Sequence, residues 1–497
     1  MGLPYFKPFV PDAARTKTVL KLAGPVMAAN LTQTLINQFD TILVGHLPKE
    51  YSIAGQAALG YSVLLHWMVG GFVGAISVGT QAMTARRLGE DNRPGAGGVL
   101  FNSIMLALMA GTFVTVLAIV FTRPLFALFT SNEQVLALGV PYTQARFAGI
   151  LSMVGTLSFK AFFDGLGKTH YHLMVAVGMN VVNAVLAYML VFGFWGIPGM
   201  NVVGAGIAAT VASYFGLFGM LAFALKTSHR KDFNIFRVSN FRWKTIGGIA
   251  RLSVPSGIAT VFVMTGFLLF FKWVGMLDEA VMSGPLDPMD TASIAWLGSF
   301  SGLPVDSTTF ESLVNIHAPV NEAATKVIID ILFLSIMACM GLGIATATLV
   351  SQNMGRRQPE EAEKYGWTAV RIGAWFAGIL GVAALIWPDA AMGIFTQDPE
   401  VVEVGRTPLR IVAAGEFAIG FGLVLAQALF GAGASRFVMK VEIALHVGVL
   451  VPLSYVLAIP LGLKLNGIFI AAIVYVVLLA LFMTLKFRSG TWKSIRI

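Results

Sequence analysis

A stripe of polar side chains runs through the first long apolar segment of the chain, residues 20–43. Its four members, spaced by three, four and three residues, are Asn30, Gln33, Asn37 and Asp40. This spacing places all four on one face of a helix. An ionisable group in hydrocarbon costs several kcal/mol, so Asp40 is a candidate for ion or proton binding. The alternative is that the stripe only hydrogen-bonds to a neighbouring helix.

Two later apolar segments carry shorter polar faces. Asn180 and Asn183 lie in one of them, and Thr210 and Ser213 lie in the next. Amide and hydroxyl oxygens near a carboxylate suit a hard cation, so Na+ at Asp40 is the one metal ion that this pattern favours. Hydrogen bonding between helices is again the alternative interpretation.

The second half of the chain offers other carboxylates. Glu416 lies in an apolar segment, and Glu442 and His446 are four residues apart, on one face of a helix. A carboxylate beside an imidazole can act as a proton relay, because a buried acid titrates at higher pH and histidine titrates near neutrality. We therefore predict Gln33, Glu416, Glu442 and His446 as substrate-cavity residues or an alternative proton site. A structural interhelical pair is the other interpretation. Lys160 and Asp164 are also four residues apart, near the end of one helix, and we predict that they form a structural ion pair.

The composition is that of a membrane protein. Of the 497 residues, 56% are hydrophobic and only 12% are charged, and apolar runs long enough to cross a bilayer recur along the chain. The sequence GLGKT at 165–169 lacks the full Walker spacing and joins two apolar segments, so it is not a nucleotide site. The sequence has neither histidines at metal-ligand spacing nor a nucleophile with a base, so we expect no enzyme and no cofactor.

Twelve apolar segments can be assigned as transmembrane helices: 20–43, 53–79, 97–121, 135–160, 170–193, 202–225, 247–272, 323–348, 366–387, 404–429, 437–460 and 465–486. Basic residues concentrate in alternate loops, above all at 226–244. The positive-inside rule then predicts that both termini are cytoplasmic. Topology thus accounts for the net charge of +9 without nucleic acid as a partner.

The chain contains an internal repeat. Residues 79–96 align with 345–362, which sets Gly89 against Gly355. In the first helix of each half Pro25 aligns with Pro255, and the smaller offset there indicates an acidic insertion at about 277–321. The polar stripe is not repeated, because its aligned positions are Thr260, Val263, Phe267 and Phe270.

These observations predict an all-α polytopic membrane protein, with two pseudo-symmetric six-helix bundles around a central cavity. The first bundle is 1–225, the cytoplasmic linker is 226–246, and the second bundle is 247–497 with a periplasmic insertion. Parallel repeats that face each other are typical of alternating-access transporters.

The motifs resemble the multidrug and toxic compound extrusion (MATE) family. The sequence LAGPVMAANLTQTLINQFDTILVGHL at 22–47 is similar to that family's first helix, and DGLGKTH and FGAGASR are similar to its Gly-x-Gly turns. The resemblance implies that Asn183 and Thr210, with Asn37 and Asn180 nearby, join Asp40 around a cation or proton. The chain departs from the family where Ala187, Val263 and Ile419 replace polar or acidic residues that some members carry.

The resemblance implies a cation-coupled antiporter that exports cationic, amphipathic drugs or toxic compounds by alternating access in exchange for H+ or Na+. We expect a monomer in the bacterial inner membrane. The runner-up function is a flippase for a lipid-linked oligosaccharide, which would need a strongly cationic cavity, whereas Lys and Arg are scarce at the centres of these segments.

Overall fold

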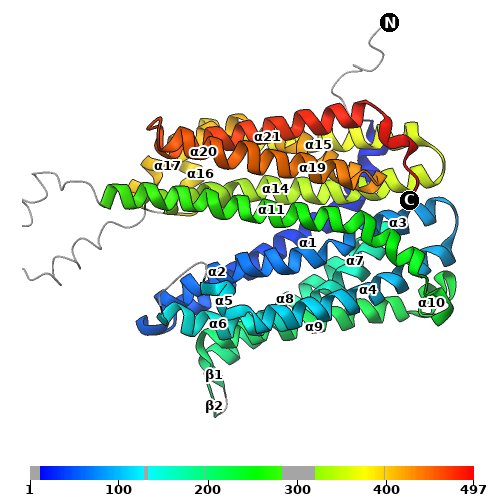
Figure 1. Ribbon diagram of the computed structural model, residues 1–497, viewed down its shortest axis with the longest axis horizontal. Coiled ribbons are helices and arrows are strands. Elements are labelled where there is room, and N and C mark those ends of the chain that lie inside the picture. Colours follow the sequence, from blue (N-terminus) through cyan, green and yellow to red (C-terminus); the bar gives the residue numbers. More distant parts are fainter. Residues whose placement is uncertain (1–11, 128–132, 195, 283–319, 397) are drawn as a thin grey trace, which may run out of the picture.

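The computed structural model describes residues 12–127, 133–194, 196–282, 320–396 and 398–497, and long helices dominate it (Figure 1). The first half contains α1 (Ala13–Gly45), α2 (Lys49–Gly74), α3 (Ile76–Gly89), α4 (Arg93–Val120), α5 (Thr122–Ala127), α6 (Glu133–Ala148), α7 (Ile150–Gly165), α8 (His170–Phe192) and α9 (Asn201–Leu225). The second half contains α11 (Trp243–Met282), α14 (Val320–Gly355), α15 (Pro359–Ile386), α16 (Pro388–Gly393), α17 (Pro399–Ala414), α18 (Glu416–Ala432), α19 (Ser435–Leu445), α20 (Val451–Ala458) and α21 (Lys464–Arg488).

The predicted twelve-helix, two-bundle architecture is confirmed. Within the described ranges, ten helical segments are long and apolar enough to span a membrane. The pair α17 and α18, bent by 53°, forms an eleventh span, and α1, with 33 residues and its polar stripe, is the twelfth long helix. Between α8 and α9, the short strands β1 (Gly193–Phe194) and β2 (Ile197–Pro198) pair as an antiparallel hairpin.

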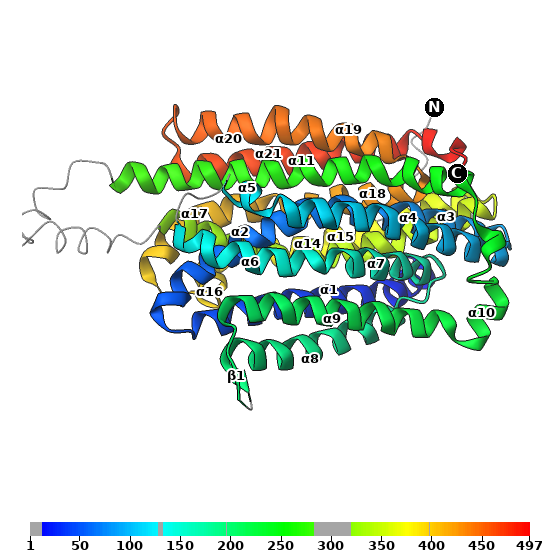
Figure 2. The same cartoon turned by 60° about the horizontal axis from the view of Figure 1, so that its bottom comes forward.

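The two ends of the molecule differ in charge. The short helix α10 (Thr227–Phe233) and the C-terminal residues lie at one end, which we call the basic end, whereas α5, α16 and the hairpin lie toward the opposite end (Figures 1 and 2). At the basic end Lys168 lies 2.7 Å from His229 of α10. Burial in this contact lowers the pKa of Lys168, and the charges of Arg93 and Lys226 act in the same direction.

Helix α11 is longer than the sequence analysis predicts. It continues ten residues beyond residue 272, so the first residues of the expected insertion are helical. Near its end, the Asp278 carboxylate accepts hydrogen bonds from the backbone amides of Asn321 and Glu322, at 3.0 Å each. Asp278 therefore joins the two flanks of the insertion, whose residues 283–319 lie outside the described residues.

Helices α1 and α11 each pack against both halves. At the basic end, Val19 and Ala23 of α1 belong to a core cluster built from the second half, whereas Val44 packs among first-half residues. The pattern is reversed in α11: Ile249 lies in a first-half cluster and Phe270 in a second-half cluster. The repeated first helices thus cross between the bundles in a pseudo-symmetric way.

The aligned glycines of the repeat meet where the halves touch. A Cβ atom added to Gly89 would lie 3.0 Å from the Gly355 Cα atom, and one added to Gly355 would lie 3.0 Å from the Gly89 Cα atom. Each would also clash with backbone oxygen of the other half, at Gln352 and Arg86 respectively. Only glycine allows the ends of α3 and α14 to approach this closely.

Side-chain hydrogen bonds surround this glycine contact. Gln81 donates to the Ile344 carbonyl at 2.9 Å, and Ser351 donates to the Ala82 carbonyl at 2.7 Å. Gln352 donates to the Gly165 carbonyl at 2.8 Å. The two halves are therefore tied together by polar contacts near the basic end.

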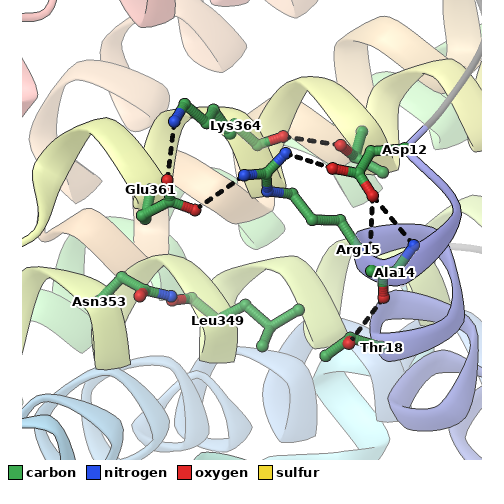
Figure 3. Close-up of polar contacts among 9 residues, drawn as sticks. Asp12, Ala14, Arg15, Thr18, Leu349, Asn353, Glu361 and Lys364 are labelled. Carbon is green, nitrogen blue, oxygen red and sulfur yellow. Dashed lines mark hydrogen bonds and ion pairs between the residues drawn. The ribbon is translucent and has the colours of Figure 1, made fainter.

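An ion pair adds to the same closure. Arg15 of α1 lies between Asp12, at 2.6 Å, and Glu361 of α15, at 3.1 Å, and Lys364 also pairs with Glu361 (Figure 3). These side chains are about a quarter or more exposed, so we expect their contribution to stability to be small.

Candidate functional site

The structure brings Asp40 of α1 against Asn183 of α8. The Asn183 Nδ2 atom donates to the Asp40 Oδ1 atom at 3.1 Å, and both side chains are buried, with 4% and 5% exposure. Two residues that are 143 positions apart in the sequence thus form one polar pair inside the first bundle. A buried carboxylate held by an amide can exist either charged or protonated, which is what an ion-coupling group requires.

Small residues position this pair. Leu43 of α1 packs with Ala187 of α8 and Ala208 of α9 in a separate apolar cluster one turn from the polar pair. Ala187 is completely buried, so the position where some family members carry a polar residue is used for packing. Ligands for a cation at Asp40 must therefore come from other residues.

The side-chain oxygen atom of Asn183 has no hydrogen-bond partner in the structure. This Oδ1 atom is buried. A buried amide oxygen of this kind is costly unless a proton donor or a cation satisfies it. Together with the Asp40 carboxylate, it supplies oxygen atoms for a transient ligand such as hydronium, water or Na+.

Thr210 does not hydrogen-bond to Asp40 in this conformation. Its hydroxyl donates to the Ala145 carbonyl at 2.6 Å and so ties α9 to α6. Ser213 donates to the Ala209 carbonyl within its own helix. A role for Thr210 at a bound ion thus stays a prediction, in which its oxygen would act through the lone pairs that this hydrogen bond leaves free.

The other members of the predicted group have different surroundings. Asn30 and Asn180 are half-buried and Gln33 is exposed, whereas the side chain of Asn37 lies outside the described residues. The stripe on α1 therefore passes from an exposed position at Gln33 to a buried one at Asp40.

Arg146 is a further neighbour of the site, one that the sequence patterns did not single out. Arg146 lies in α6, and its charge acts on Asp40 as well as on the buried groups His66 and Tyr142. The His66 Nδ1 atom is buried without a hydrogen-bond partner. An arginine within the apolar segment 135–160 was the available signal, but only packing shows that it faces the Asp40 side of the bundle.

Glu416 is the buried carboxylate of α18. Its Oε1 atom accepts a hydrogen bond from Ser335 of α14 at 2.6 Å, and the residue is 2% exposed. It follows the bend at Gly415 and packs against Gly381 of α15. It belongs to the second half of the chain, as does Ser335, its hydrogen-bond donor.

The Glu442 and His446 pair is present, with a partner that the sequence analysis did not include. Tyr475 of α21 donates to the Glu442 Oε2 atom at 2.9 Å, and the His446 Nδ1 atom lies 3.5 Å from that oxygen. His446 begins η2 (His446–Leu450), a π-helical turn between α19 and α20. The Lys160 and Asp164 pair is also present, at 2.6 Å, as the predicted structural ion pair.

Among the described residues there is no group of three or more His, Cys, Asp and Glu side chains that could hold a metal ion. They instead offer separate buried carboxylates, each with one or two hydrogen-bond donors. Such groups suit the reversible uptake of a proton or of a weakly held monovalent cation.

Comparisons with known proteins show the family of the chain. The sequence profile of the MatE family matches residues 25–189 and 308–456. The chain is 24% identical to the probable multidrug resistance protein NorM of Thermotoga maritima, over 96% of this chain and 93% of that protein. It is 22% identical to the multidrug resistance protein PmpM of Pseudomonas aeruginosa, over 90% and 84% of the two chains.

Solved structures show the same fold. The eukaryotic MATE transporter AtDTX14 superposes with a TM-score of 0.78 at 16% identity, over 97% of each chain. A MOP superfamily transporter from Pyrococcus furiosus superposes with a TM-score of 0.79 at 19% identity, over 96% of this chain and 95% of that one. With the profile match over most of its length and two bundles of six helices, the chain belongs to the multidrug and toxic compound extrusion (MATE) family of transporters.

Proposed function

We propose that the chain exports cationic, amphipathic compounds from the cell and takes up H+ or Na+ in exchange. The observation that carries this proposal is the buried Asp40 and Asn183 pair in the first bundle. The names of the multidrug resistance relatives support the substrate class. The positive-inside pattern supports a multi-pass protein of the inner membrane with both termini in the cytoplasm.

The position of Asp40 suits an ion that enters from outside. Asp40 lies five residues before the end of α1 at Gly45, which corresponds to about 8 Å along the helix axis. This end of α1 is opposite the basic end, where the halves are tied together. With the basic end in the cytoplasm, as the positive-inside pattern predicts, the carboxylate would lie toward the side from which an incoming ion loads.

Drug and ion would compete for the same negative charge. When Asp40 is charged, it attracts a cationic drug, and when an ion or a proton neutralises it, that attraction is lost. Each ligand then shifts the equilibrium between the two bundle arrangements by its differential affinity for them. The contacts at Gly89 and Gly355 would open and close during the cycle.

Arg146 favours H+ as the first coupling ion to test. A proton neutralises Asp40 without a shell of ligands, whereas Na+ needs several oxygen atoms and is repelled by a nearby guanidinium. The Asp40 and Asn183 pair by itself supplies few oxygen atoms for Na+, which would need further ligands. H+ is therefore the first ion to test, and Na+ is the second.

Reconstituted protein can test the proposal. In proteoliposomes with an imposed pH gradient or Na+ gradient, the wild-type protein should export a fluorescent lipophilic cation under one of the two. Asp40→Asn should remain folded, because the amide is nearly isosteric, and should lose gradient-driven export. The matched control is Asp330→Asn, which removes a carboxylate whose partner Lys326 is 66% exposed.

Two outcomes would contradict the proposal. Wild-type export rates in Asp40→Asn would make Asp40 a structural residue. Transport of a lipid-linked oligosaccharide instead of the cation would favour the flippase. Orientation has a separate test: alkaline phosphatase should be active when fused after Gly199 and inactive when fused after Asn234, and the reverse result would invert the topology.

A further inference from the structure

We propose that Glu442, Tyr475 and His446 form a second proton-binding site, in the second bundle. The site rests on geometry that the Asp40 proposal does not use. The Glu442 side chain is 13% exposed and the His446 side chain 2% exposed, so both lie in the interior of the bundle. Its ligand would be a single proton, taken up by the Glu442 carboxylate to give the neutral carboxylic acid.

Two helices hold the carboxylate. Tyr475 of α21 donates its hydroxyl proton to the Glu442 Oε2 atom at 2.9 Å. The His446 Nδ1 atom lies 2.9 Å from the Glu442 carbonyl oxygen and 3.5 Å from the Oε2 atom, and its ring packs against the Tyr475 ring at 4.4 Å between centroids. The carboxylate thus has a hydroxyl donor and an imidazole next to the same oxygen.

The backbone forms a π-helical turn at His446, and a proline six residues later explains it. Pro452 lies in the first turn of α20 and has no N–H group, so it cannot donate to the carbonyl four residues earlier. The helix accommodates this with the π-helical turn His446–Leu450. Such turns in transmembrane helices often occur at functional sites, because they redirect side chains and free backbone groups.

The internal repeat supports the assignment. The offset of the repeat sets the helix with Glu442 and His446 against α8, which carries Asn183, and sets Tyr475 of α21 next to the position that matches Thr210 of α9. The two sites therefore share one equivalent helix, α8 in the first bundle and α19 in the second, and differ in the other. The carboxylate comes from α1 in the first bundle and from α19 in the second.

The site is placed to influence the contact between the halves. A Cβ atom added to Gly266 of α11 would lie 2.9 Å from the His446 Cδ2 atom, so the imidazole packs directly on α11. The same helix contacts the first half near the basic end, where Gly79 donates its backbone N–H to Ser253 at 3.3 Å. A change of charge at Glu442 and His446 can therefore bias a helix that belongs to both halves.

The charged and titratable neighbours are few. Helix α21 faces the carboxylate with Tyr475, and α11 meets the imidazole at Gly266, which has no side chain. In α18, Glu416 is engaged with Ser335 and packs on α15 instead. Of the described side chains, Tyr475 and His446 are the ones within hydrogen-bonding or ion-pairing distance of Glu442.

Infrared difference spectroscopy tests proton binding without any transport. The purified protein is titrated with acid, and the C=O stretching bands of protonated carboxyl groups are recorded. Glu442→Gln should remove one band that Asp40→Asn and Glu416→Gln retain. Tyr475→Phe should keep that band but move it to higher frequency, because the carboxyl group loses a hydrogen bond. This variant also serves if Glu442→Gln fails to fold.

Transport then tests whether this proton is coupled to export, and this second experiment rests on the proposed function. With two protons exchanged per drug molecule and the membrane potential held at zero, a tenfold proton gradient supports a drug gradient of about 100-fold, against about 10-fold for one proton. Glu442→Gln should lower the limiting drug gradient from the first value to the second.

Each result decides a different point. If the titrating bands are the same in wild type and Glu442→Gln, the second proton site does not exist. If the band is lost but the limiting drug gradient is unchanged, the site binds a proton that is not transported, and the coupling is refuted. If neither gradient drives export in the wild-type protein, the exporter proposal fails, while the infrared result still decides the site.

Discussion

The two bundles share a fold but not the position of their buried carboxylates. In the first bundle, Asp40 comes from α1 and is held by Asn183 of α8. At the aligned position of α11 the second bundle has Phe270, which is 4% exposed and packs against Phe469. The second bundle carries buried acids at other positions, among them Glu416 on α18 and Glu442 on α19. The two halves of a duplicated fold can thus keep the same helices while their buried carboxylates lie on different ones.

The contact between the bundles shows the opposite behaviour. Gly89 and Gly355 are aligned by the repeat and touch each other, so symmetry is retained where the halves meet. The asymmetric carboxylates lie inside each bundle, where a side chain has to suit only its own neighbours. Symmetry is therefore kept at the interface and lost in the interiors.

The largest loss of stability is expected when an acid is placed in the second bundle at position 270, which aligns with Asp40. Phe270→Asp should prevent stable folding, because it removes a buried aromatic ring, at a cost of about 3–5 kcal/mol, and leaves an unpaired charge in its place. Fluorescence-detected gel filtration and thermal unfolding in detergent would measure this loss. The control Phe270→Leu should remain folded. A folded Phe270→Asp protein would show that the second bundle accepts a carboxylate there.

The next effect concerns the Asp40 partner. Asn183→Ala removes a hydrogen bond to a charged group, which is worth about 1.5–3 kcal/mol, so export driven by the proton gradient should fall by about tenfold or more. Ser213→Ala is the matched control, since its hydroxyl bonds only within α9. Equal rates in wild type and Asn183→Ala would remove Asn183 from the site.

Substitution of either glycine at the contact between the two halves should have the same effect on how the halves are arranged. Gly89→Val and Gly355→Val each place side-chain atoms against the opposite backbone, and overpacking of this kind costs about 1–3 kcal/mol, enough to shift a two-state equilibrium by about 5- to 150-fold. Both variants should populate a state in which the basic end is open. The control is Gly98→Val, because a Cβ atom at Gly98 has no neighbour within 4 Å.

Spin labels would measure that opening. With Cys339 replaced by serine, labels at Arg93 and Gln358, which are exposed at the basic end, should show a longer distance in both valine variants. A change in only one of them would break the symmetry that the glycine contact implies.

The smallest effect is expected from the surface ion pair. Arg15→Gln should lower stability by about 0.2–1 kcal/mol at low salt and by less at high salt, because the pair is exposed and screened. Thermal unfolding at two salt concentrations would measure it. Arg87→Gln is the control, since Arg87 pairs with Glu90 within one half of the chain. A larger loss for Arg15→Gln than for its control would show that the pair stabilises the closed basic end.

Much of the fold follows from the sequence. Apolar length, loop charge and the repeat at Gly89 and Gly355 can be read from the sequence, and they predicted the helices and the two halves. The family followed from the resemblance of the motifs at 22–47 and at the Gly-x-Gly turns. The end of α11 was predicted ten residues too early, because the acidic side chains that indicated a loop include Asp278, which instead caps α14. The β-hairpin at Gly193 was too short to leave a pattern.

The site was predictable only in part. Helical periodicity and the cost of burying a charge selected Asp40 and Asn183 as candidates, and the i,i+4 spacing selected Glu442 and His446. The sequence could not show that Thr210 donates to Ala145, that Arg146 acts on Asp40, or that Tyr475 completes the second site. Spacing along one helix determines which side chains share a face. Which faces then meet depends on how the helices cross, and that is decided by the packing of residues far apart in the chain.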